Sequence, residues 1–211
     1  MPGGPPPRSG GKGPLVAVLV IVLVLGLGVG GYFVYRGLDD SAKAKPVVDS
    51  SQDLEKAPIG CAMFDEAEVA PYIPGRMDYE VGSANPGPGE SYDQGQCAWN
   101  NPDFTKQKVR PAHVIVTSYV YHANLKMSGV DRAKEHLDRR VRTRAVAVNV
   151  EDADDALLVE QKKVDWSVEV VVRYHNVVYS IVYSNQTEGA NVKGGATALA
   201  TIAIGKVAKD D

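Results

Sequence analysis

Residues 164–183 read VDWSVEVVVRYHNVVYSIVY, and this stretch decides the fold class. Apolar side chains recur at every second position on both sides of the short polar segment Tyr174-His175-Asn176. A period of two is typical of β-strands, and two such runs joined by a polar turn predict an antiparallel hairpin. We expect one face of this hairpin to be buried and the other to face water.

The sequence on either side of the hairpin predicts further strands and helices. In chain order these are a helix over Glu66–Val69, a strand over Met77–Val81, a Pro- and Gly-rich loop over residues 83–96, a strand over Val109–His122, a helix from Ser128 to Val141 and a helix over Ala196–Lys209. Helices and antiparallel strands in this order predict an α+β domain, with the helices packed on one face of the sheet.

The N-terminal part of the chain has a different composition. Residues 15–35 carry no charge, and 21 residues at about 1.5 Å each span roughly 30 Å of hydrocarbon, which predicts a single transmembrane helix. Residues 1–14 are rich in Gly and Pro and predict a disordered basic tail. Residues 36–57 mix charged and small side chains and predict a flexible linker, so that the folded domain comprises residues 58–211.

Two other interpretations of this N-terminal part are less consistent with the sequence. A cleavable signal peptide has an apolar region of about 7–15 residues, which is shorter than residues 15–35. Ile59-Gly60-Cys61 resembles the end of a lipidation site, but a lipidated cysteine directly follows the apolar run, and Cys61 does not. An uncleaved membrane anchor is therefore the preferred interpretation.

The orientation of the anchor follows from charge and from the cysteines. Lysine and arginine counts on the two sides are nearly equal, but the tail before the helix has no acidic residue, whereas Asp39, Asp40 and Asp49 follow it. Cys61 and Cys97 are the only two cysteines, and an even number in an exported domain predicts a disulfide. We therefore expect a single-pass protein of the cell membrane, with the N-terminus cytoplasmic and the domain extracytoplasmic.

The composition argues against several functional classes. From Pro46 onward the chain has 24 acidic and 18 basic residues, and this negative charge argues against nucleic-acid binding. The four histidines lack the spacing of paired metal ligands, and residues 151–155 lack the pattern of an EF-hand loop. No nucleophile elbow or phosphate-binding loop is present. We therefore predict a protein that is not an enzyme and has no cofactor.

One cluster of basic residues is the candidate site. Its members lie within and just after the helix predicted from Ser128, and they are Arg132, Arg139, Arg140, Arg142 and Arg144. Such a cluster is able to contact an anionic lipid or an acidic partner. The alternative is a solvated helix face, in which pairs such as Glu135 with Arg139 and the acidic run just after it neutralise much of the charge.

Three motifs carry a resemblance to a known group of proteins. Cys61-Ala62-Met63-Phe64 leads into Asp65-Glu66-Ala67-Glu68-Val69, and Cys97-Ala98-Trp99 follows. Over residues 58–209 the chain resembles small exported actinobacterial domains of uncharacterised function, which are lipoproteins or membrane-anchored proteins. More distantly, it is similar to the extracellular sensor domains of bacterial serine/threonine kinases, although it has no kinase domain. The resemblance implies an envelope role, with Trp99 packed beside the disulfide.

Two functions are consistent with this organisation. The first is a non-catalytic extracytoplasmic binding or sensing module of the bacterial envelope, held in the bilayer by residues 15–35 and recognising an envelope component or another membrane protein. The second is a structural accessory subunit, because Gly26 and Gly30 permit close contact with a partner helix. Replacing the helix by an unrelated apolar span separates them, since only the accessory subunit loses its function.

Overall fold

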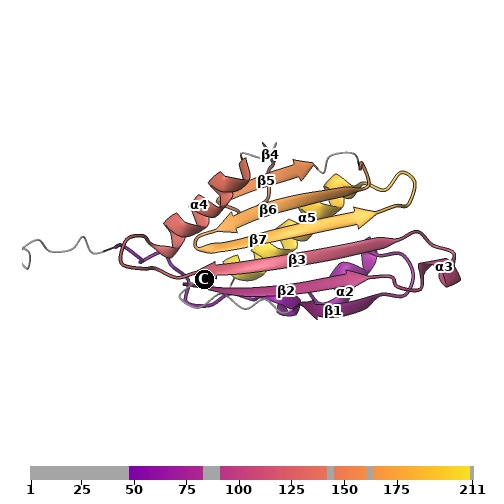
Figure 1. The fold of residues 1–211 in the computed structure, drawn as a ribbon, viewed down its shortest axis with the longest axis horizontal. Coiled ribbons are helices and arrows are strands. Elements are labelled where there is room, and N and C mark those ends of the chain that lie inside the picture. The colour runs from indigo at the N-terminus through magenta and orange to yellow at the C-terminus, as the bar shows by residue number, and fades with distance from the viewer. Residues whose placement is uncertain (1–47, 83–90, 142–144, 161–163, 210–211) are drawn as a thin grey trace, which may run out of the picture. The chain divides into compact units, whose positions relative to one another are not determined.

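The domain is built on a single antiparallel sheet. The computed structural model describes residues 48–82, 91–141, 145–160 and 164–209, all of which belong to the compact unit Val48–Asp211. Seven strands pair in the order β1-β2-β3-β7-β6-β5-β4 (Figure 1). The strands are β1 (Asp78–Gly82), β2 (Tyr92–Asn100), β3 (Ala112–Tyr121), β4 (Ala145–Ala147), β5 (Asp155–Glu160), β6 (Ser167–Tyr174) and β7 (Val177–Asn185). The predicted α+β class with an antiparallel sheet is confirmed.

The predicted hairpin forms the centre of the sheet. In β6 and β7, Tyr174 pairs with Val177 at the turn and Ser167 pairs with Ser184 at the open end. Strand β7 also pairs along its length with β3, so this strand is bordered by a partner on both sides. Side chains of a strand alternate between the faces, and the sheet therefore has two distinct surfaces to cover.

The first face of the sheet carries the main hydrophobic core. Helix α5 (Val192–Ala208) lies across β6 and β7, behind the sheet in Figure 1. Its Ala196, Ala200 and Ala203 are fully buried, and such small side chains let the helix backbone approach the strands closely. The short elements η1 (Gly60–Met63), α2 (Glu66–Val69) and η2 (Ala70–Tyr72) add Met63 and Val69 to the same core.

The second face carries its own helix, which corrects the prediction that the helices share one face. Helix α4 (Gly129–Val141) buries Ala133 and Leu137 against Val171 and Val178, which point away from α5. The prediction of a wet second face for the hairpin is also wrong here. Among the α4 side chains whose burial the structure describes, two buried apolar ones make this contact, so the signal in the sequence is weak.

Some of the predicted helices and strands are confirmed, others are wrong, and some elements were not predicted. Helices α2 and α4 begin as predicted, with Asp65 and Ser128 accepting hydrogen bonds from backbone N–H groups of their first turns. The loop predicted over residues 83–96 is wrong for its last part, because β2 begins at Tyr92, and residues 83–90 lie outside the described residues. The short helix α3 (Phe104–Gln107) and the strands β4 and β5 were not predicted.

The domain begins earlier than its composition suggests. Asp53 accepts hydrogen bonds from the backbone N–H groups of Gly129 (2.7 Å) and Val130 (2.9 Å) at the start of α4. The N–H of Leu54 donates to the Asn176 side chain at 2.8 Å, and Asn176 donates back to the Leu54 carbonyl at 3.0 Å. These bonds fix residues 53–54 on the domain, which corrects the prediction of a flexible linker extending to residue 57. We call residues 48–57 the strap.

The membrane-related predictions concern a different part of the chain. The predicted tail (1–14), transmembrane helix (15–35) and first part of the linker (36–47) lie outside the described residues. Among the helices that the structure does describe, none has the length and apolar character needed to cross a bilayer.

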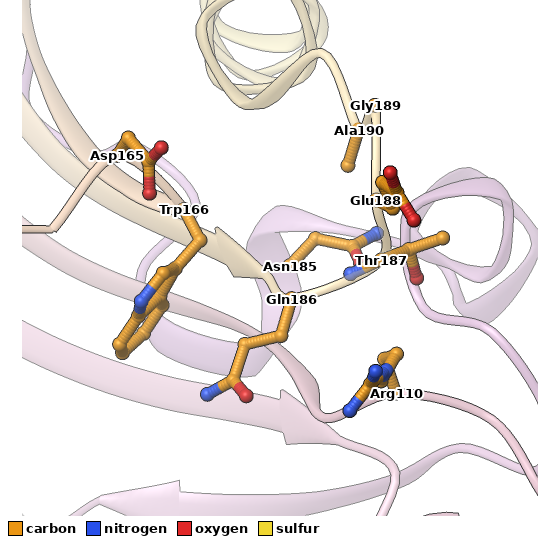
Figure 2. A pocket seen from close by; sticks show the side chains of 9 residues that line it. All are labelled: Arg110, Asp165, Trp166, Asn185, Gln186, Thr187, Glu188, Gly189 and Ala190. Carbon is orange, nitrogen blue, oxygen red and sulfur yellow. The ribbon is translucent and has the colours of Figure 1, made fainter.

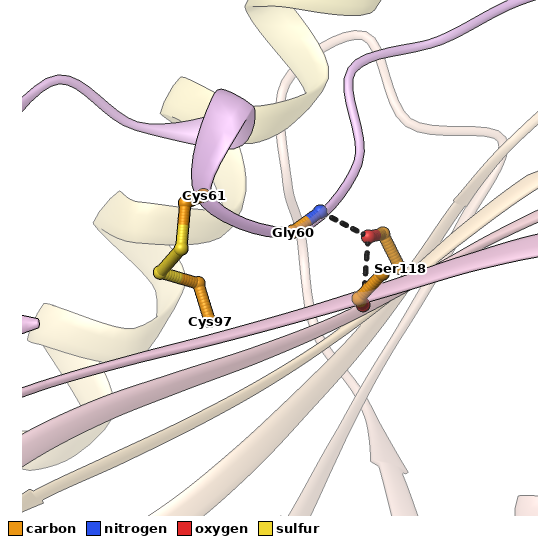
Figure 3. The surroundings of a disulfide bond; sticks show 5 residues. Gly60, Cys61, Cys97 and Ser118 are labelled. Atoms are coloured by element: carbon orange, nitrogen blue, oxygen red, sulfur yellow. Dashed lines mark hydrogen bonds between the residues drawn. A yellow bond between two sulfur atoms is a disulfide. The ribbon is translucent and has the colours of Figure 1, made fainter. Parts of the chain in front are cut away.

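The predicted disulfide is present and fixes η1 on the sheet. Cys61 and Cys97 are bonded, with their Cα atoms 4.9 Å apart (Figure 3). Beside it, the Ser118 hydroxyl accepts a hydrogen bond from the Gly60 N–H at 2.7 Å and donates to the Gly95 carbonyl at 3.0 Å. A Cβ atom at Gly95 would lie 2.6 Å from the Gly60 nitrogen, so this close approach requires glycine.

Trp99, which the family resemblance implies to be packed beside the disulfide, is a buried residue of β2. It follows Cys97 by two positions in β2, so both side chains lie on the first face of the sheet. Its ring is buried and packs edge-to-face on Phe64 at a centroid distance of 5.7 Å. The disulfide and this aromatic pair together hold η1 and the start of α2 against β2.

Candidate functional site

A pocket of about 370 Å³ lies between α4 and the second face of the sheet. We call it the tyrosine–arginine pocket, and its lining residues are Tyr92, Tyr119, Tyr121, Arg132, Glu135, His136 and Arg139. Strands β2 and β3 supply the tyrosines, and α4 supplies the charged residues and the histidine. Polar and aromatic groups that converge in one pocket are typical of a small-molecule site.

The sequence places both sets of side chains on facing surfaces. Tyr92 and Tyr121 are direct cross-strand partners of β2 and β3, and Tyr119 lies two positions before Tyr121 on the same face. On α4, the four lining residues follow the spacing i, i+3, i+4 and i+7, which forms one stripe along a helix. The pocket therefore results from one strand register and one helix face.

The tyrosine rings pack against each other. The centroids of Tyr92 and Tyr119 are 5.9 Å apart, and those of Tyr92 and Tyr121 are 5.4 Å apart. The His136 ring lies 4.9 Å from Tyr119. Ring pairs at such distances hold one another in place, and the wall of the pocket is therefore preorganised.

His136 is the most perturbed titratable group of the pocket. Burial, with the nearby Arg140 and Arg139, lowers the pKa of His136 from 6.5 to about 4. Burial also raises the pKa of Tyr121 to about 12. The Tyr121 hydroxyl and Nδ1 of His136 form a hydrogen bond of 2.7 Å, so two neutral groups pair at neutral pH. Within the described part of the chain, the buried Nε2 of His136 has no hydrogen-bond partner.

The two arginines of the pocket differ in how they are held. Nη1 of Arg132 donates to the carbonyls of Ser91 (2.6 Å) and His122 (2.9 Å). The Arg132 guanidinium also lies 5.4 Å from the centre of the Tyr121 ring, within cation–π distance. Arg139 is more exposed and lies 3.5 Å from Glu135. With His136 neutral, the lining carries one net positive charge.

The described members of the predicted basic cluster lie in different surroundings. Arg132 and Arg139 meet at the tyrosine–arginine pocket. Arg140 lies 3.7 Å from Glu169 of β6, and its charge is partly balanced there. Arg142 and Arg144 lie outside the described residues. Glu135 beside Arg139 and Glu169 beside Arg140 agree with the alternative of a partly neutralised helix face, and contact with an anionic lipid or an acidic partner stays a prediction.

Comparisons with protein-family models, curated proteins and solved structures found no match. The membership implied by the family resemblance stays a prediction. The chemistry of the site therefore rests on the chain's own residues.

A second pocket of about 410 Å³ lies near the start of β6. Figure 2 shows Asp165 and Trp166, which directly precede β6, with Arg110 and the segment from Gln186 to Ala190 around them. Trp166 is 37% exposed, and Asp165, Arg110 and Glu188 are exposed as well. We call it the Trp166 pocket. Exposed side chains are free to rotate, so it is less preorganised than the tyrosine–arginine pocket.

Asn185 at the edge of the Trp166 pocket belongs to the glycosylation pattern Asn185-Gln186-Thr187. Its side chain is buried, and its amide nitrogen donates to the Tyr183 hydroxyl at 2.9 Å. The amide oxygen accepts from the Thr187 N–H at 2.9 Å. In the folded domain this amide is committed to internal hydrogen bonds, which disfavours glycosylation.

Other chemistry is constrained by the same structure. Both cysteines are bonded to each other and are therefore not free nucleophiles. Over the ranges that the structure describes, no three His, Cys, Asp or Glu side chains are grouped to hold a metal ion. The acidic turn before β5 is occupied by Arg173, whose guanidinium lies 3.0 Å from Asp154 and 2.6 Å from Asp155.

Sequence reasoning missed the tyrosines and His136 as site residues. Tyr92 lies in the stretch predicted to be a loop, so its pairing with Tyr121 could not be anticipated. Tyr119 and Tyr121 alternate within a predicted strand, and His136 and Arg139 are three positions apart on a predicted helix. This alternation and spacing were the available signals, but nothing in them indicated that the two elements face each other.

Proposed function

We propose that this protein is a non-catalytic binding or sensing module of the bacterial envelope, anchored by residues 15–35 with its domain outside the cytoplasm. The observation that carries the proposal is the tyrosine–arginine pocket. There, Arg132 and Arg139 project from one helix toward three packed tyrosine rings. Fixed aromatic and charged groups around a small cavity favour recognition of a ligand.

The disulfide and the uncharged N-terminal stretch support the proposed location of the domain outside the cytoplasm. Cysteine pairs stay oxidised in exported domains and are kept reduced in the cytoplasm. Cys61 and Cys97 form such a pair. The transmembrane helix is supported by the composition of residues 15–35.

The pKa values support binding rather than catalysis. General acid–base catalysis works best when the pKa of the catalytic group lies near the operating pH. The pKa of His136 is lowered to about 4 and that of Tyr121 is raised to about 12, so neither side chain exchanges protons readily at neutral pH. The pair is suited to a fixed pattern of hydrogen bonds.

The strap supports a sensing role. Asp53 holds the first turn of α4, and the same helix carries Arg132, His136 and Arg139 of the pocket. The strap follows directly on the segment that leads from the proposed anchor. A ligand that shifts α4 would therefore act on the strap, the first segment of the domain after the proposed anchor in the sequence.

The compartment is tested on intact cells from which any outer wall has been removed. We expect external protease to remove the domain, and both cysteines to resist alkylation until a reductant is added. Free thiols together with a protected domain would place the domain in the cytoplasm and would overturn the proposal.

Binding is tested with the purified full-length protein in detergent micelles. A low-molecular-mass fraction of the envelope is expected to raise its unfolding temperature, because a ligand that binds the folded state stabilises it. Arg139→Gln is expected to lose this response, whereas Lys134→Gln keeps it. Lys134 is exposed on the same helix and does not line the pocket, so the two variants remove the same charge. Equal responses of the two variants would refute the proposed site.

A further inference from the structure

We infer that the tyrosine–arginine pocket binds a small ligand in which one anionic group, a carboxylate or a phosphate, is attached to a ring. The inference rests on the proposed binding function and names the ligand class. It follows from the size of the pocket, its uncompensated charge, the unpartnered imidazole nitrogen of His136 and the aromatic wall.

The size of the pocket limits the ligand to about one ring and one charged group. Small-molecule sites range from about 300 to 1,000 Å³. The volume of about 370 Å³ is near the lower end of this range. An extended polymer segment does not fit within such a volume.

One positive charge of the pocket has no counter-charge. Arg139 has a carboxylate neighbour, because Glu135 lies 3.5 Å away. Arg132 is held by two backbone carbonyls, which carry no net charge, and no carboxylate lies within ion-pair distance of it in the described part of the chain. A ligand with a single negative charge would balance Arg132, and hydrogen bonds between arginine and an anionic oxygen are among the strongest in proteins.

His136 adds a buried polar atom to the pocket lining. The Tyr121 hydroxyl and Nδ1 of His136 share a hydrogen bond of 2.7 Å, whose direction depends on the imidazole tautomer. In the tautomer with its proton on Nε2, the Tyr121 hydroxyl donates to Nδ1 and Nε2 is a donor. This Nε2 is buried and has no hydrogen-bond partner among the described residues. A buried polar atom without a partner destabilises the folded protein, and a ligand oxygen would satisfy the Nε2–H tautomer. This tautomer and Arg132 favour the same ligand chemistry, that of an oxygen-rich anion.

The tyrosines provide the surface for a ring. Tyr92 and Tyr119 are only partly buried, and their rings meet edge-to-face, 5.9 Å apart. Ring faces and edges of this kind contact another ring over a large area. An inorganic anion would bind at Arg132 without contacting these rings, so a ring attached to the anion accounts for both the arginine and the tyrosines of the pocket.

The test measures affinities of the full-length protein in micelles for five probes by isothermal titration. Phenyl phosphate and glucuronate combine a ring with an anionic group, and they distinguish an aromatic from a sugar source of that chemistry. Inorganic phosphate has the anionic group without a ring, and phenol and glucose have a ring without an anionic group. We expect at least one ring-bearing anion to bind about tenfold more tightly than each of these three probes.

The position of binding is read by NMR of selectively labelled histidine and tryptophan side chains. We expect His136 to shift and Trp166, which marks the Trp166 pocket, to stay unchanged. Arg132→Gln is expected to weaken binding about tenfold, whereas Lys134→Gln binds like the unaltered protein. Arg139→Gln serves as a second pocket variant if Arg132→Gln does not fold, since Arg139 is more exposed.

Several results would overturn the inference. They are equal affinity for a neutral ring, equal affinity for inorganic phosphate, a shift at Trp166 in place of His136, or no binding of either ring-bearing anion. If one of these results is found but the envelope fraction still stabilises the protein in an Arg139-dependent way, the proposed function stands and only the ligand class is wrong. If no ring-bearing anion binds and the envelope fraction does not stabilise the protein, the ligand class and the proposed function are both wrong.

Discussion

Lowering the pH from about 7.5 to about 5 is expected to cost the folded domain about 2 kcal/mol through His136 alone. The pKa of this side chain is lowered from 6.5 to about 4, mainly by burial. In this window the unfolded chain takes up a proton at His136 and the folded domain does not. The free energy of unfolding therefore falls as the pH falls, beginning near the unfolded pKa and ending below the folded pKa.

The charged neighbours of His136 act in the same direction as burial. Arg139 and Arg140 on its own helix disfavour its protonated form. From the sheet it is faced by Tyr119 and Tyr121, whose pKa values are raised by burial, so both stay neutral in this window. No neighbouring group that titrates between about pH 5 and about pH 7.5 is expected to offset the effect.

The assay is urea unfolding of the full-length protein across this pH range, compared with His136→Gln. Glutamine accepts a hydrogen bond from Tyr121 but does not titrate. His113 and the carboxylates titrate in both proteins, so the difference between the two curves isolates His136. We expect the stability advantage of the unaltered protein to shrink by about 2 kcal/mol toward acidic pH. Parallel curves would refute the assignment of a buried, neutral His136.

Three further predictions concern stability. Asp53→Ala should lower the free energy of unfolding by about 1–2 kcal/mol in thermal melts, because two N–H groups of α4 lose their acceptor, whereas the exposed Glu55→Ala should have little effect. Reducing Cys61–Cys97 should cost about 4 kcal/mol in denaturant titrations, since a long loop is released in the unfolded chain. Ala203→Leu should cost about 1–3 kcal/mol, seen as a lower denaturation midpoint, because Ala203 is fully buried under the sheet. A loss in Glu55→Ala equal to that in Asp53→Ala, no effect of reductant, or an unchanged Ala203→Leu midpoint would contradict the respective argument.

The fold could be predicted where side-chain periodicity is strong. Strands β6 and β7 alternate over their whole length, and α5 has apolar residues at helical spacing. By contrast, β2 begins with the polar run Tyr92-Asp93-Gln94-Gly95-Gln96, and the short β4 has three residues. Strands of this kind are defined by their neighbours in the sheet, which a local pattern does not reveal.

The candidate site was less predictable than the fold. Basic residues near α4 were visible as a charge cluster, and Arg132 and Arg139 do line the pocket. Arg139 lines the pocket, whereas Arg140 lies beside Glu169, and this difference depends on which side of α4 meets β6. The aromatic wall depends on the pairing of Tyr92 with Tyr121 across two strands. Contacts between elements distant in sequence decide both features.

The strap was missed for a related reason. Its composition is that of a linker, yet Asp53 and Leu54 form hydrogen bonds with residues 76 and 122 positions away. Such bonds satisfy the orphan N–H groups at the start of a helix. A polar segment with a well-placed carboxylate is therefore able to dock on a domain without an apolar pattern of its own.

The disulfide also determines how the domain would respond to a mechanical load applied from its N-terminal side. A pull would first break the bonds of the strap and then reach Cys61, which is joined to Cys97 in β2. From there the force would pass directly into the sheet and bypass the intervening chain. The separation of 36 residues corresponds to roughly 120 Å of extended chain. This segment would not extend under force until a reductant broke the disulfide.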